Sequence, residues 1–257
     1  MLGKLLKYEI PALGRKLVPL YIGWAVTAAF LGLMVGPSQS KTEFGVVISG
    51  LLYTAAATAV VVMGVIMIVQ RYSRSLLGDE GYFSHVLPVT ASEHIASKSI
   101  AALVWVLLSG VALIVTGLII VIFSGTLKVI NIDGLTEFFR LLSQTPLTGW
   151  LTLLELLILF ALSTTKSILG IYTALTIGHQ AKTRTGLASI GAYFGVLVFE
   201  STVGRVCMSA FGSMIQDFDV LESFHGPFVI LSLITIAIGA VYFFVCKYLM
   251  EKRLNLA

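Results

Sequence analysis

Four residues about a third of the way along the chain carry side chains that could bind a metal ion or transfer a proton. They are Asp79, Glu80, His85 and His94, and zinc and calcium take carboxylate or imidazole ligands of this kind. A glycine and a proline lie among them, so the four groups share no single helical face. The H-E-x-x-H pattern of zinc proteases is absent, and the other two histidines lie far along the chain. We therefore predict no metal site and no acid–base catalysis.

The patterns of nucleophilic catalysis and nucleotide binding are also missing. Ser-Gly pairs occur at 49–50, 109–110 and 124–125, but no histidine accompanies them in the apolar segments, as an activated serine requires. No G-x-x-x-x-G-K-[ST] phosphate loop occurs in the sequence. We therefore expect a chain that is not an enzyme and binds no cofactor itself. If ATP drives it, ATP and Mg are held by a partner subunit.

The composition is that of a membrane protein. Hydrophobic residues make up 57% of the 257 residues and charged residues only 12%, against about 25% charged in a typical soluble domain. A helix needs about 20 apolar residues to cross the hydrocarbon core, and backbone groups in lipid must be satisfied within the segment. The sequence thus predicts an all-α integral membrane protein with a single transmembrane domain, 1–257. Its six predicted spans are 17–36, 44–69, 99–124, 149–172, 186–208 and 227–246.

The distribution of basic residues predicts the orientation of these spans. With the N-terminus in the cytoplasm, the outer connections hold three basic residues, Lys41, Lys128 and Arg140. The inner segments hold twelve, namely Lys4, Lys7, Arg15, Lys16, Arg71, Arg74, Lys98, Lys182, Arg184, Lys247, Lys252 and Arg253. Because cytoplasmic loops carry the excess of Lys and Arg, both termini are expected in the cytoplasm. The chain is expected to cross the membrane several times.

Two flanking segments have amphipathic or apolar character. Residues 1–16 alternate leucines with basic residues, which predicts a short amphipathic helix on the inner leaflet, interrupted at Pro11. A basic flank that only sets orientation is the alternative. The outer connection 209–226 is too apolar for a plain solvated loop, so we expect short re-entrant helices there, between spans five and six.

Several charged residues fall inside predicted spans, where charges are costly and usually face protein or water. Glu155 lies in span four, while Glu200 and Arg205 lie in span five. If these spans are neighbours, the three side chains could line an outward polar cavity. The alternative is a structural ion pair that joins the two helices. Lys166, in the inner half of span four, is expected to reach the membrane interface with its long side chain.

Small residues could bring helices close together. Gly32 and Gly36 in span one, and Gly191 and Gly195 in span five, have the G-x-x-x-G spacing that permits close helix packing. Packing within one subunit is one interpretation, and dimerisation through either pair is the other.

Three segments resemble the membrane subunits of type-2 ATP-binding-cassette exporters. Residues 71–105 read RYSRSLLGDEGYFSHVLPVTASEHIASKSIAALVW and resemble the connection between spans two and three, where an "EGYl…tLPvs…sKl" pattern is common in Firmicutes members. Residues 171–195, IYTALTIGHQAKTRTGLASIGAYFG, resemble the connection between spans four and five. Residues 5–21, LLKYEIPALGRKLVPLY, resemble the N-terminal segment. With the six-span topology, the resemblance covers nearly the whole chain, although Ser84-His85 departs from the pair usual in relatives.

The resemblance implies a half-transporter, in which two membrane subunits pair and cytosolic ATPase subunits drive them. The loop between spans two and three would dock on the ATPase, within the cytoplasmic segment 71–98. The residues expected to couple the two subunits are Asp79, Glu80, Gly81, Tyr82, Phe83, His85 and Pro88. Their charges would pair with basic groups, and their aromatic rings would supply anchors. A solvated loop with incidental charges is the alternative. His179, Lys182 and Arg184 could form a smaller contact.

We therefore expect the permease subunit of an ATP-driven exporter, with the translocation path at the interface of a homodimer or a dimer with a related permease. Its partners would be the ATPase subunit, the second membrane subunit and the lipid bilayer, with no nucleic acid. Apolar residues along spans one, two and five favour a peptide or an amphipathic drug as cargo. The competing interpretation is a non-transporting immunity or sensor subunit that binds a peptide. A membrane-embedded enzyme is a third, disfavoured by the missing motifs.

Overall fold

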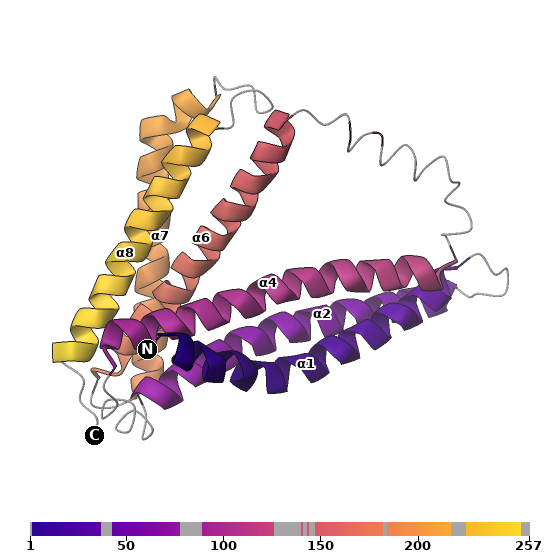
Figure 1. Ribbon diagram of the computed structural model, residues 1–257, viewed down its shortest axis with the longest axis horizontal. Coiled ribbons are helices and arrows are strands. Elements are labelled where there is room, and N and C mark those ends of the chain that lie inside the picture. The colour runs from indigo at the N-terminus through magenta and orange to yellow at the C-terminus, as the bar shows by residue number, and fades with distance from the viewer. Residues whose placement is uncertain are drawn as a thin grey trace. The chain divides into compact units, whose positions relative to one another are not determined.

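The computed structural model describes residues 2–36, 43–77, 89–125, 140, 143, 147–181, 184–216 and 225–252. Six long helices make up most of this part of the chain (Figure 1). They are α1 (Leu2–Val35), α2 (Glu43–Tyr72), α4 (Ala91–Phe123), α6 (Leu147–Gly178), α7 (Thr185–Gln216) and α8 (His225–Lys252). A π-helical turn, η1 (Ser73–Leu77), continues α2. No strand occurs in the described ranges.

All six helices are long and apolar enough to cross a membrane. Large apolar side chains are exposed on every one of them, for example Ile22, Val61, Ile114, Leu157, Val198 and Phe244. Such extensive apolar exposure is unfavourable in water but costs nothing against lipid chains. The predicted all-α membrane protein with six spans is therefore confirmed. The helices also extend past the predicted ends, because a helix keeps its backbone hydrogen bonds when its sequence becomes polar at the interface.

The N-terminus differs from the sequence-based expectation. Residues 1–16 were predicted to form a separate short helix that breaks at Pro11, but α1 runs without interruption from Leu2 to Val35, with Pro11 and Pro19 inside it. The indole nitrogen of Trp105 donates to the carbonyl of Ile10, at 2.9 Å. Pro11 lacks the N–H that would bond the carbonyl of Lys7, so the helix loses one backbone hydrogen bond there, while the Trp105 indole fastens the same turn of α1 to α4. The basic N-terminal residues therefore belong to the first long helix.

The outer connection 209–226 also differs in part from what was expected. Residues 209–216 continue α7, and residues 225–226 begin α8. The first half of the segment is therefore an extension of a spanning helix and not a separate re-entrant one. Residues 217–224 lie outside the described residues.

The chain divides into two compact units. One unit comprises residues 7–68 and 104–145, so it contains most of α1 and α2 and the second half of α4, which run alongside one another (Figure 1). Gly32 brings α1 against α4, since a Cβ added there would lie 2.7 Å from the carbonyl oxygen of Ile120. In the same unit, the hydroxyl groups of Tyr53 on α2 and Thr116 on α4 form a hydrogen bond at 3.2 Å.

The other unit comprises residues 1–6, 69–103 and 146–257. Within it α6 packs against both α7 and α8, and the three helices lie side by side in Figure 1. Gly170 permits the approach of α8 and α7 to α6, because an added Cβ would touch Tyr242 at 3.3 Å and Val196 at 3.4 Å. This unit holds the polar contacts described below.

The packing of Gly32 predicts a difference between two glycines of α1. Gly32→Ala should lower the free energy of unfolding by about 1–3 kcal/mol, because the methyl group meets backbone that cannot move aside. Gly23→Ala is the matched control, since nothing lies within 4 Å of its added Cβ. It should be neutral or stabilising by up to about 1 kcal/mol, as alanine favours the helix. Thermal unfolding of the detergent-solubilised protein measures both, and equal stability of the two variants would contradict the packing.

Candidate functional site

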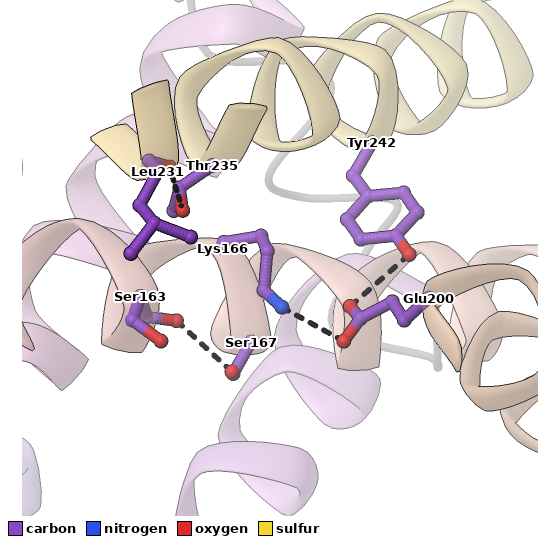
Figure 2. A network of polar contacts seen from close by, with 7 residues as sticks. All are labelled: Ser163, Lys166, Ser167, Glu200, Leu231, Thr235 and Tyr242. Atoms are coloured by element: carbon purple, nitrogen blue, oxygen red, sulfur yellow. Dashed lines mark hydrogen bonds and ion pairs between the residues drawn. The ribbon is translucent and has the colours of Figure 1, made fainter. Parts of the chain in front are cut away.

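A charged pair lies inside the membrane-spanning helices α6 and α7. The ammonium group of Lys166 donates to Oε2 of Glu200 at 2.8 Å, and the two side chains are 17% and 24% exposed. Tyr242 of α8 donates its hydroxyl to the other carboxylate oxygen, Oε1, at 3.1 Å. Figure 2 shows Lys166 and Tyr242 pointing toward the same carboxylate from different helices. One acidic group therefore joins three helices.

Small residues at two positions allow this arrangement. Gly239 of α8 lies beside Lys166, with an added Cβ only 3.9 Å from the lysine Cβ. Gly170 lies one turn along α6 from Lys166 and gives room to the ring of Tyr242. A side chain at Gly170 would crowd the ring of Tyr242, which must lie close to α6 for its hydroxyl to reach Glu200.

The pair is costly to break. Removing one partner of a buried ion pair leaves an uncompensated charge in a medium of low polarity, which typically costs about 3–5 kcal/mol. Charged residues within membrane helices usually face the protein interior or a polar cavity and mark functional sites. The partial exposure of both side chains agrees with this, because they border a cavity.

The cavity has a volume of about 260 Å³ and lies among α6, α7 and α8. Lys166 and Glu200 form its charged wall. Its remaining lining is largely apolar and consists of Val203, Gly204, Cys207, Ile230, Leu231, Ile234, Thr235 and Ile238. Thr235 uses its hydroxyl proton on the carbonyl of Leu231, at 2.7 Å (Figure 2), so only its oxygen lone pairs remain for other partners. The cavity thus combines one charged side with an apolar side, as an amphipathic ligand requires.

The predicted polar patch of Glu155, Glu200 and Arg205 is distributed differently. No hydrogen bond or ion pair within the described ranges joins these three residues to one another. Glu155 instead contacts Nδ1 of His225, the first residue of α8. Arg205 is exposed, because it follows Glu200 by five residues and so lies about 140° around α7 from it.

The alternative interpretation was an ion pair that joins spans four and five. The structure contains an ion pair between these spans, but its cation is Lys166 and not Arg205. That lysine was expected to reach toward the interface, and it pairs with Glu200 instead. Glu155 lies eleven residues before Lys166 on α6, which separates the two levels by about 16 Å along the helix.

A second polar cluster lies where α2 ends. Tyr72 is completely buried, and its ring stacks on that of Tyr172 with centroids 3.9 Å apart. Its hydroxyl lies 2.9 Å from both Thr176 Oγ1 of α6 and Cys246 Sγ of α8. We call Tyr72, Tyr172, Thr176 and Cys246 the tyrosine junction. It fastens the end of α2 to α6 and α8.

The predicted ATPase-coupling residues follow directly after this junction. Asp79, Glu80, Gly81, Tyr82, Phe83, His85 and Pro88 lie outside the described residues. The chain on both sides of them is well anchored. Before them, Leu76 of η1 is completely buried. After them, Thr90 and Glu93 cap α4 reciprocally, with Thr90 N–H donating to Glu93 Oε2 at 3.2 Å and Glu93 N–H to Thr90 Oγ1 at 3.4 Å.

The other predicted positions are placed as follows. Gly36 is buried, whereas Gly191 and Gly195 of α7 are exposed with open space beside them. His179 contacts the carbonyl of Leu175 through Nδ1, and Arg184 has a left-handed backbone with φ of 58° before α7 begins. Lys182 lies outside the described residues, and no metal-binding group of three acidic, histidine or cysteine residues occurs in the part that is described.

Sequence reasoning did not find Tyr72, Tyr242 or the role of Lys166. A signal was present for Tyr242, which lies within predicted span six, whereas tyrosines of membrane proteins concentrate at the interfaces. Tyr72 is the last residue of α2, next to Arg71, where a tyrosine is usual. A buried tyrosine hydroxyl requires a hydrogen-bond partner, and here the partners of both tyrosines come from other helices.

Known proteins add nothing to this geometry. No protein-family model, curated protein or solved structure matches the chain. Its function must therefore be argued from the residues themselves.

The charged pair predicts a non-additive pattern of stability. Glu200→Gln leaves Lys166 charged without its anion, so the free energy of unfolding should fall by about 3–5 kcal/mol. The double variant Lys166→Met with Glu200→Gln removes both charges and should recover most of that loss. Thermal unfolding in detergent tests this as a double-mutant cycle. Additive effects of the two substitutions would show that the pair does not interact.

Proposed function

We propose that this chain is the permease subunit of an ATP-driven exporter in a bacterial plasma membrane. It forms the translocation path as a dimer, and separate cytosolic ATPase subunits drive it. A peptide or an amphipathic drug is the proposed cargo. The six apolar helices and the resemblance of segments 5–21, 71–105 and 171–195 to type-2 exporter subunits support this proposal.

The observation that carries the proposal is the tyrosine junction. A docking element transmits force only if it is joined firmly to the helices that it moves. Tyr72 lies four residues before Leu76 and seven before Asp79, and its buried ring and hydroxyl connect the end of α2 to α6 and α8. A displacement of the segment after Leu77 would therefore be passed to two further helices and not be absorbed by a loose loop.

The coupling then follows from ordinary linkage. The ATPase subunits would adopt two arrangements, depending on the bound nucleotide. Because the docked segment has a different affinity for each of them, nucleotide binding shifts the population of the membrane dimer between two states. Asp79 and Glu80 would supply charge for recognition, and Tyr82 and Phe83 the apolar anchors.

Co-purification with the ATPase tests the docking role. The test needs a phosphate-loop ATPase of the exporter class, sought among the proteins encoded beside this chain and expressed together with it. Replacing Asp79 and Glu80 by Ala should abolish co-purification and the ATP turnover of the complex, while the thermal stability of the permease stays unchanged. Glu251→Ala is the matched control, since Glu251 is an exposed carboxylate at the same predicted membrane face. It should retain both.

Two outcomes would overturn the proposal. One is undiminished ATPase binding by the Asp79/Glu80 variant. The other is a chain that purifies alone from cells that express the neighbouring ATPase, which would favour an immunity or sensor subunit. Hydrolysis of a peptide or lipid by the purified chain would instead make it an enzyme.

The tyrosine junction gives a second, separable prediction. Tyr72→Phe keeps the stacked ring but removes the hydroxyl that Thr176 and Cys246 contact, which should cost about 1–3 kcal/mol of unfolding free energy. The ATPase should still co-purify, because the docking segment is intact. The stimulation of ATP turnover by cargo should fall, because displacement is transmitted less well. Tyr248→Phe, an exposed tyrosine of α8, is the control, and equal turnover in both variants would contradict a coupling role.

A further inference from the structure

The cavity beside Lys166 and Glu200 has unused hydrogen-bonding capacity on its charged side. An ammonium group has three donors, and a carboxylate has about four lone-pair positions. The contact to Glu200 uses one donor of Lys166, and Lys166 and Tyr242 use two positions of Glu200. Lys166 can therefore still donate to an anionic or neutral oxygen, and Glu200 can still accept from a cationic group.

Electroneutrality restricts what can bind there. The pair is neutral as a whole, and a ligand with a single net charge would leave an uncompensated charge in apolar surroundings, at a cost of several kcal/mol per ion. An uncharged or zwitterionic head group avoids this cost. Of the two, a zwitterion gains charge-assisted hydrogen bonds to both residues, and these are roughly twice as strong as neutral ones.

The rest of the cavity accepts a hydrocarbon chain. Ile230, Ile234 and Ile238 follow one another at intervals of four residues along α8 and form an apolar stripe on the lining. Leu231 lines the cavity next to Ile230 and is 40% exposed. The apolar lining therefore continues onto the outer surface of α8, which would face lipid. The volume of about 260 Å³ is slightly below the range of drug-sized ligand sites, which run from about 300 to 1,000 Å³. It therefore fits a head group and the start of one chain, and the remaining chain would lie in the bilayer.

Lys166 lies within predicted span four. It is six residues from the inner end of that span at residue 172, which corresponds to about 9 Å along the helix from the predicted interface. A lipid head group does not rest at that depth in a bilayer, because its charges would be desolvated. The charged wall of the cavity replaces the lost hydration.

We propose that this cavity binds the zwitterionic head group of a single-chain amphipath that enters from the bilayer. The ligand's anionic group contacts Lys166, its cationic group contacts Glu200, and its chain follows the isoleucine stripe of α8. The binding rests on the cavity alone. Whether the bound molecule is then carried across the membrane rests on the proposed function.

Cys207 provides a native reporter, because it lines the cavity and is partly exposed, whereas Cys246 is buried. The full chain in a nonionic detergent is treated with a small methanethiosulfonate reagent, and modification of Cys207 is followed by peptide mass. Lysophosphatidylethanolamine, whose ammonium group has N–H donors for Glu200, should slow this modification at a concentration at least about tenfold lower than the monoacylglycerol or the lysophosphatidylglycerol of the same chain length, as one extra charge-assisted hydrogen bond predicts.

Two variants separate binding from general effects of lipid. Gly204→Leu fills the cavity from α7, where nothing lies within 4 Å of an added Cβ, and should abolish the protection. Gly191→Leu is the matched control, since it faces equally open space on the same helix outside the cavity lining, and should retain it. The double variant Lys166→Met with Glu200→Gln should lose the preference for the zwitterion and keep its fold, as measured by thermal unfolding.

The proposal is overturned if the three lipids protect Cys207 equally or not at all, or if Gly204→Leu or the double variant keeps the preference. If the Lys166–Glu200 pair only held helices together, the three lipids would protect Cys207 without any preference among their head groups. Because this experiment needs no ATPase, its failure is distinguishable from loss of ATPase docking by the Asp79/Glu80 variant.

Discussion

A polar group inside a bilayer has no water to bind, so the backbone donors and acceptors of this chain must find their partners within the protein, and its intramembrane charges are costly unless they are paired. For the backbone, that requirement produces six long helices. For the side chains, it produces contacts between helices, because a single helix seldom satisfies its own charged groups. Glu200 is bound by a lysine from α6 and a tyrosine from α8, and the Tyr72 hydroxyl is bound in the same manner by Thr176 and Cys246.

The two polar clusters share the same pair of helices. On α6, Lys166 and Thr176 are ten residues, or about 15 Å, apart. On α8, Tyr242 and Cys246 are one turn apart and lie on the same face. A displacement of α8 at the tyrosine junction therefore also moves Tyr242 and the isoleucine stripe of the cavity. This shared framework is the physical basis of the proposed link between the docking segment 71–98 and the cavity beside Lys166 and Glu200.

Much of the architecture could be predicted from residue types. Six apolar segments of sufficient length predicted six helices, and the positions of all six agree with the structure because lipid permits no other form for such a segment. The ends of the helices were harder to predict from the sequence. Helix α1 contains Pro11 without a break, and α7 continues to Gln216. Whether a helix continues past its apolar core depends on local contacts such as the Trp105 indole at the Ile10 carbonyl, which composition does not reveal.

The amino-acid sequence by itself determined that the chain is a helical membrane protein with costly charges at Glu155, Lys166, Glu200 and Arg205. Only the tertiary structure decided how these charges pair. Arg205 was predicted to meet Glu155 and Glu200, yet the helical period places it about 140° around α7 from Glu200. Lys166 is thirty-four residues away but faces Glu200 across the contact of α6 with α7. Pairing follows distance in space, and that distance is set by how the helices pack.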